Sequence, residues 1–238
     1  MFWIDGAMGE KSILVAILGG LLCLDRVFLQ SLVSRPIVVA SVLGFVLHDL
    51  PTALVMGSLM EILWADHLPI GVYIPPNDSL MAVVATGGTI LAGEELGSVS
   101  KQMMAFSILL FLPLAFLAQR LDQWIVAMNG VLSDRAVRSA AEGRPGGITG
   151  SICVSLGRTL ALYILFIFLF LLIGDFILVK LYPLCSGEVP MKALLIVFWS
   201  LPLVGIAAVL NTVRQRGSLS VFTGLFFLAV LFGTLFRS

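Results

Sequence analysis

The feature that most constrains this chain is the run from Thr159 to Val179, which is apolar over the length needed to cross a lipid bilayer. A helix of about 20 apolar residues spans the roughly 30 Å of hydrocarbon. Asp175 is the single charged residue in this run, and the whole chain is 59% hydrophobic and 12% charged. A soluble protein of this length would expose large apolar patches at that composition. We therefore predict an all-α integral membrane protein.

Charge and motif content exclude several classes of function. Positive and negative charges balance to zero with no basic block, which argues against nucleic-acid binding because that needs clustered cations. The three cysteines (Cys23, Cys153 and Cys185) stand alone and are expected to be apolar fillers. No nucleophile elbow, zinc-protease motif, phosphate-binding loop or Cys/His cluster is present. The sequence predicts no catalytic residue, no metal site and no cofactor.

The first half of the chain, residues 1–118, consists of short hydrophobic pieces. Ile13–Leu24 is too short to span, so we expect a partial or re-entrant helix there. Val27–Leu47 is long enough but contains Pro36, which should kink it. Gly- and Pro-interrupted hydrophobic segments are typical of a transporter's binding region. The remaining pieces of this half are Thr52–Trp64, Leu80–Ala92 and Gln102–Ala118.

The rest of the chain is predicted as a polar loop followed by spanning helices. Residues 119–158 carry five arginines and are expected to form a cytoplasmic loop, with a surface-lying helix at Leu132–Glu142. Residues 159–238 contain apolar runs that we predict to span the membrane as helices. We expect residues 1–238 to form a single membrane-embedded domain, a polytopic helical bundle. The three runs are Thr159–Val179, Ala193–Val213 and Leu219–Phe236.

A polar stretch from Met56 to Asp78 interrupts the apolar first half and is predicted to hold the substrate site. It is broken by Gly57, Pro69, Gly71, Pro75 and Pro76, and it carries Glu61, Asp66, His67, Asn77 and Asp78. Irregular backbone at membrane depth is tolerated only inside protein or beside a wet cavity. Ionisable side chains there are costly, so they point to function.

Each residue of this stretch also has a structural interpretation. Glu61 could accept hydrogen bonds from sugar hydroxyls, or it could pair with Arg35 to hold the bundle. Asn77 and Asp78 could cap the following helix, face a substrate, or do both. His67 could respond to pH, although an interfacial loop histidine fits its neighbours better.

Ion pairing is the expectation for the charged residues upstream. Asp25 and Arg26 close an apolar run and are expected to form a pair at a helix end. Arg35 lies among apolar residues and therefore needs a buried partner or a wet neighbour.

Four motifs resemble the enzyme IIC component of the mannose/fructose/sorbose family of bacterial phosphotransferase systems. They are Leu24-Asp25-Arg26, Ser34-Arg35-Pro36-Ile37-Val38, Gly57-Ser58-Leu59-Met60-Glu61 and Leu68-Pro69-Ile70-Gly71-Val72-Tyr73-Ile74-Pro75-Pro76-Asn77-Asp78. Ser133-Asp134-Arg135-Ala136 and Glu142-Gly143 also resemble that family's central cytoplasmic segment. The resemblance covers most of the chain and is loose after about residue 158.

The resemblance implies a non-catalytic sugar permease subunit in the bacterial cytoplasmic membrane. It implies a separate membrane subunit, enzyme IID, and soluble IIA and IIB carriers that pass phosphate from phosphoenolpyruvate to the sugar. It also implies a trimer of heterodimers. Carried over by position, Glu61, Asn77 and Asp78 are the expected sugar contacts, and His67 lies within the same motif.

Departures from the family pattern keep two other functions open. Asn77 stands where the family usually has an acidic residue, His48, Asp66 and His67 are atypical, and Tyr73 replaces a small residue. One alternative is an ion-coupled carrier or channel without phosphorylation, with proton-relay candidates Asp66, His67 and Asp175. The other is a membrane scaffold that has lost transport.

Overall fold

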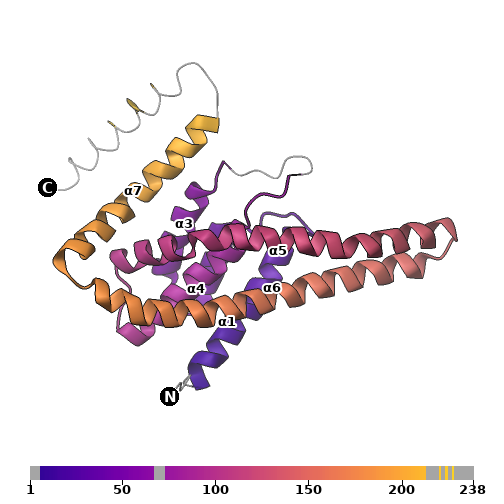
Figure 1. Ribbon diagram of the computed structural model, residues 1–238, viewed down its shortest axis with the longest axis horizontal. Coiled ribbons are helices and arrows are strands. Elements are labelled where there is room, and N and C mark those ends of the chain that lie inside the picture. The colour runs from indigo at the N-terminus through magenta and orange to yellow at the C-terminus, as the bar shows by residue number, and fades with distance from the viewer. Residues whose placement is uncertain (1–5, 67–72, 213–219, 221–222, 225–226, 228–238) are drawn as a thin grey trace.

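The computed structural model describes residues 6–66, 73–212, 220, 223, 224 and 227, and every element of regular secondary structure within these ranges is a helix (Figure 1). This confirms the predicted all-α bundle. The expected last span, Leu219–Phe236, lies almost wholly outside the described residues. In chain order the elements are α1 (Gly6–Leu24), α2 (Pro36–Val46), α3 (Leu50–Leu63), α4 (Asp78–Leu96), α5 (Lys101–Ala141), α6 (Pro145–Leu181), the 3₁₀ turn η1 (Tyr182–Cys185) and α7 (Glu188–Thr212).

Helix α4 lies at the centre of the bundle. Every residue from Ser79 to Gly93 is buried, and the helix packs against α1, α2, α3, α5 and α6. Small residues permit this crowding, since a side chain at Gly87 would press on Val15 of α1. The hydroxyl oxygen of Thr89 lies 2.6 Å from both the carbonyl oxygen of Ala85 and the hydroxyl oxygen of Ser107 on α5, within hydrogen-bond distance of each. The central helix is thus shielded from lipid over most of its length.

The predicted kinked helix over Val27–Leu47 is wrong for its first nine residues. Residues 25–35 form turns, and α2 begins only at Pro36. Proline has no N–H to donate and disfavours helical conformation in the residue before it, so it starts a helix better than it continues one. Helix α2 then packs antiparallel to α3, and glycines at 44 and 57 provide the close approach.

Residues 119–158 form a helical hairpin, which corrects the predicted polar loop. Helix α5 continues through Leu132 to Ala141, so the expected surface-lying helix is the last part of α5. The chain turns at Glu142–Arg144, where Gly143 has a φ of 68°, and returns as α6. The 41 residues of α5 extend about 60 Å, and the paired helices project well beyond the rest of the bundle (Figure 1).

Three of the described helices are long and apolar enough to cross a membrane: α5, α6 and α7. The runs Thr159–Val179 and Ala193–Val213 lie within α6 and α7, apart from one residue at the end of the second. Leu165, Ile173 and Ile196 are each at least half exposed, as lipid-facing side chains would be. The chain is therefore a multi-pass membrane protein.

Candidate functional site

The segment before α4, residues 73–77, is hydrogen-bonded to α5. Asn77 is fully buried, and its side-chain oxygen accepts a 2.9 Å hydrogen bond from the N–H of Leu80, which caps α4. The backbone N–H of Asn77 donates a 2.9 Å hydrogen bond to the backbone carbonyl of Ala115. Gln119 donates a 2.5 Å hydrogen bond to the carbonyl of Ile74. The predicted capping role of Asn77 is confirmed.

Asp122 joins α4, α5 and α6 in one buried polar cluster. One carboxyl oxygen accepts a 2.8 Å hydrogen bond from the Asn77 side-chain amide, and the other accepts one of 2.8 Å from the hydroxyl of Tyr163. All three residues are buried. Sequence reasoning missed Asp122 because it placed residues 119–158 in a loop. The sequence pattern that could have identified Asp122 is a spacing of three to four residues, which is typical of one helix face. This spacing continues the buried face of α5 through Ala115, Ala118, Asp122 and Ile125.

Arg26 forms an ion pair with Asp78 at the first turn of α4, and it also donates a 3.1 Å hydrogen bond to the carbonyl of Pro76. The predicted pair between Asp25 and Arg26 is wrong. Adjacent residues that end a helix need not face each other, and the long guanidinium reaches across to another helix instead. Both members of the observed pair are mostly shielded, with 20% and 15% of their side chains exposed.

Asp25 organises the turns between α1 and α2. Its two carboxyl oxygens accept four hydrogen bonds, two each from Ser31 and Ser34. Burial raises the pKa of Asp25, but these hydrogen bonds outweigh that effect and hold the pKa below its usual value. Gln30 and Leu32 in the same segment have positive φ angles of 53° and 68°. The fixed carboxylate thus stabilises a loop that positions Arg26 and Arg35.

Arg35 and Glu61 form a second ion pair, between the start of α2 and the last turn of α3. The Arg35 Nε donates to Glu61 at 2.6 Å, and the N–H of Ile37 donates to the other carboxyl oxygen at 3.3 Å. The structural pairing weighed for Glu61 is therefore present. About a third of the Arg35 side chain is exposed, and a fifth of the Glu61 side chain.

Trp64 links the end of α3 to the first turn of α4 and to α5. Its indole N–H donates to the sulfur of Met81 at 3.3 Å, and its ring packs edge-on against Phe116 at 5.7 Å. Trp64 follows Glu61 by three residues and Met81 follows Asp78 by three, about one helical turn in each case. The Arg35–Glu61 and Arg26–Asp78 pairs therefore border the same end of the bundle.

Of the other predicted residues, Asp175 lies away from this cluster. His67 lies outside the described residues, and Asp66 closes the described segment after α3. Asp175 follows Tyr163 on α6 by 12 residues, about 18 Å along the helix. Tyr73 is 55% exposed, and His48 occupies the turn between α2 and α3 with a φ of 59°.

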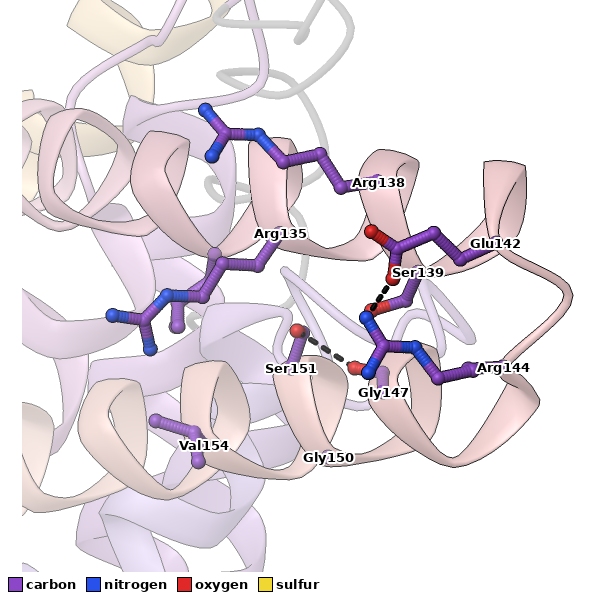
Figure 2. Close-up of a pocket in the computed structure, with 10 residues that line it drawn as sticks. Arg135, Arg138, Ser139, Glu142, Arg144, Gly147, Gly150, Ser151 and Val154 are labelled. Carbon is purple, nitrogen blue, oxygen red and sulfur yellow. Dashed lines mark hydrogen bonds and ion pairs between the residues drawn. The ribbon is translucent and has the colours of Figure 1, made fainter.

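Two cavities are lined by residues of α5 and α6, and neither is lined by Asn77, Asp122 or Tyr163. One, of about 460 Å³, lies at the hairpin tip and is lined by arginines (Figure 2). The other, of about 550 Å³, is an apolar groove near Pro113 and Gly174. The polar cluster itself is closed to solvent, since its three side chains are buried.

A multi-pass helical bundle that encloses a polar cluster at a broken helix start has the architecture of a solute-transport subunit. Residues 10–236 match the family described as the sorbose-specific IIC component of the phosphotransferase system, and the chain belongs to that family.

Curated relatives carry related names. The chain is 24% identical over 124 residues to the fructose permease IIC component of Bacillus subtilis, a match covering 49% of this chain and 46% of that protein. It is 27% identical over 99 residues to the putative N-acetylgalactosamine permease IIC component 2 of Escherichia coli, covering 42% and 69%. The match thus spans about half the length of the first relative.

Solved structures show the same fold. A structure described only as a membrane protein superposes with a TM-score of 0.73 at 22% identity, covering 94% of this chain and 87% of the other. A chain of the mannose transporter ManYZ, solved by cryo-electron microscopy with microcin E492, superposes with a TM-score of 0.59 at 23% identity, covering 94% and 86%.

Proposed function

We propose that this chain is the membrane-spanning IIC subunit of a phosphoenolpyruvate-dependent sugar phosphotransferase system. It translocates a hexose-type sugar across the bacterial cytoplasmic membrane while a separate IIB subunit phosphorylates it. The observation that carries the proposal is the family match across residues 10–236. The named relatives are a fructose permease, a putative N-acetylgalactosamine permease and a mannose transporter. The expected partners are an enzyme IID membrane subunit and soluble IIA and IIB carriers, and we expect a trimer of IIC–IID heterodimers.

The two ion pairs are the proposed sugar contacts. Glu61 and Asp78 are partly exposed carboxylates, and each can exchange its arginine for sugar hydroxyls, which supply hydrogen-bond donors. Asn77 is fully buried and bonded on both sides of its amide. It contacts the sugar only in a conformation in which its bond to Asp122 opens. His67 belongs to the same motif and completes the proposed set.

The test is uptake of labelled hexose in cells that carry all four components. We expect Glu61→Gln and Asn77→Ala to raise the KM for uptake about tenfold or more, which corresponds to about 1.4 kcal/mol of lost binding. The matched control is Glu94→Gln, which removes a carboxylate of an exposed pair with Lys11 at 2.5 Å. Unchanged uptake in both site variants would show that these residues do not form the site.

The energy source separates this function from ion-coupled transport. Uptake should require phosphoenolpyruvate and the IIB carrier, and it should yield sugar phosphate in the cell. It should persist when a protonophore collapses the proton gradient while phosphoenolpyruvate is supplied. Uptake that a protonophore abolishes, and that is indifferent to the IIB carrier, would refute the proposal.

A further inference from the structure

The tip of the α5–α6 hairpin, residues 132–154, forms a basic pocket that sugar transport does not account for. The cavity of about 460 Å³ is lined by Arg135, Arg138 and Arg144 against one carboxylate, Glu142 (Figure 2). Glu142 pairs with Arg144. Arg135 and Arg138 are exposed, and neither pairs with an acidic side chain of the described chain. The pocket therefore has two cations available to a partner.

The composition of the tip is that of a protein-binding surface. Between Lys101 and Lys180 every basic residue is an arginine. Arginine presents a planar fork that binds carboxylates through two hydrogen bonds, and it is enriched at protein interfaces where lysine is depleted. Val131, Val137 and Val154 beside the arginines are all more than half exposed. A surface that combines exposed valines with arginine guanidinium groups is suited to bind a folded protein that carries acidic side chains.

The length of the hairpin places this pocket beyond the lipid surface. The apolar run of α6 begins at Thr159, so the 14 residues from Pro145 to Arg158 extend about 21 Å further. Lipid headgroups occupy only about 5–8 Å on each side of the hydrocarbon. Charges in solution are screened over about 8 Å at physiological salt. A soluble partner therefore suits the pocket better than an anionic lipid.

Distance also excludes a reacting phosphoryl group as the occupant. Arg138 follows Asp122 on α5 by 16 residues, which is about 24 Å along the helix. A phosphoryl group bound at the tip would lie that far from the polar cluster. The pocket is therefore too far from the polar cluster to hold the reacting group.

We infer that the hairpin tip is the docking site for an acidic surface of the soluble IIB carrier. The tip would hold this carrier beside the membrane complex. This inference rests on the proposed function and adds a binding surface to it. Electrostatic docking of this kind raises the association rate and weakens with salt.

The test measures binding of the purified IIB carrier to the IIC–IID complex in nanodiscs of zwitterionic lipid. We expect the double variant Arg135→Gln/Arg138→Gln to raise the Kd for the carrier at least tenfold and to reduce the salt dependence of binding. The matched control is Arg120→Gln on the same helix, where the arginine is bonded to Gln123 at 3.3 Å and lies outside the tip pocket. It should change the Kd less than twofold.

A second variant guards against misfolding. Glu142→Gln removes the one acidic side chain of the pocket, so it should lower the Kd, which a damaged protein would not do. An unchanged Kd in both tip variants, or no carrier binding by the wild-type complex, would overturn the inference. The inference would also be overturned if the tip variants lost binding to phosphatidylglycerol vesicles but kept the wild-type Kd for the carrier. Sugar binding is measured in parallel: its absence in the wild type contradicts the proposed function, whereas normal sugar binding with unchanged carrier affinity contradicts only the docking site.

Discussion

Asn77 both caps a helix and joins that helix to its neighbour. Its side chain caps α4 through the N–H of Leu80 and binds Asp122 of α5, which in turn binds Tyr163 of α6. Buried polar groups are costly when unpaired, so loss of one member leaves its partners unsatisfied. The cluster therefore holds three helices in one relative position.

The hydrogen bond from Tyr163 to Asp122 should contribute measurably to stability. Tyr163→Phe removes a 2.8 Å bond to a buried carboxyl group and should lower the free energy of unfolding by about 1.5–3 kcal/mol. The control is Tyr182→Phe, which removes a 2.6 Å bond to the partly buried Ser100 and should cost less, about 0.5–1.5 kcal/mol. Thermal denaturation in detergent measures both. Equal losses would show that Asp122 does not depend on the tyrosine.

Sequence reasoning found part of this site and missed the rest for identifiable reasons. Asn77 as a helix cap follows from local residue types, and the prediction is confirmed. The partners of Arg26 and Asn77 lie 52 and 45 residues away along the chain. Only the packing of helices brings such residues together, and residue types alone do not specify that packing.

Among the helices, apolar runs predicted the existence of elements better than their ends. Hydropathy reports which residues lie in lipid, whereas a helix continues until its backbone is interrupted. Helix α6 therefore begins at Pro145, 14 residues before its apolar run, and α5 continues past Ala118 to Ala141. Pro36, predicted to kink a helix, instead begins α2.

The close contact of α2 and α3 depends on Gly57. A methyl group there would lie 2.8 Å from the Ala40 side chain and 3.0 Å from the Cα of Ile37, so Gly57→Ala should push the helices apart. We expect a loss of about 1–3 kcal/mol in stability and weaker sugar binding, since Arg35 and Glu61 join these helices.

The control for this variant is Gly130→Ala. A methyl group at Gly130 meets nothing within 4 Å, and alanine favours a helix interior by about 1 kcal/mol. This control should be neutral or stabilising in the same thermal denaturation assay. A Gly57→Ala protein as stable as the wild type would show that α2 and α3 tolerate a wider separation.

In the whole molecule, the three native cysteines report the arrangement in the membrane. Cys153 is exposed on the hairpin, Cys185 is partly exposed at the other end of α6, and Cys23 is buried. Cys153 and Cys185 are separated by 32 residues, about 48 Å of helix, which exceeds the bilayer thickness. They should therefore lie on opposite sides of the membrane.

Labelling with a membrane-impermeant maleimide tests this arrangement. The positive-inside rule predicts that the hairpin, which carries the five arginines of residues 119–158, faces the cytoplasm. Cys185 should react in intact cells, Cys153 only in inside-out vesicles, and Cys23 only after denaturation. Three variants, each of which keeps one cysteine and has the other two changed to serine, assign each labelling signal to one cysteine. Reaction of Cys153 in intact cells would show that the topology is the reverse of the predicted one.

The burial of α4 from Ser79 to Gly93 has a consequence for how the protein is made. Helix α4 is not among the helices long and apolar enough to cross a membrane, and it carries Asp78, Glu94 and Glu95. Two of its covering helices, α5 and α6, are synthesised after it. The helix that carries the polar cluster therefore gains a stable place in the bilayer only when the ribosome has delivered its neighbours, so membrane integration and assembly of the site are one event.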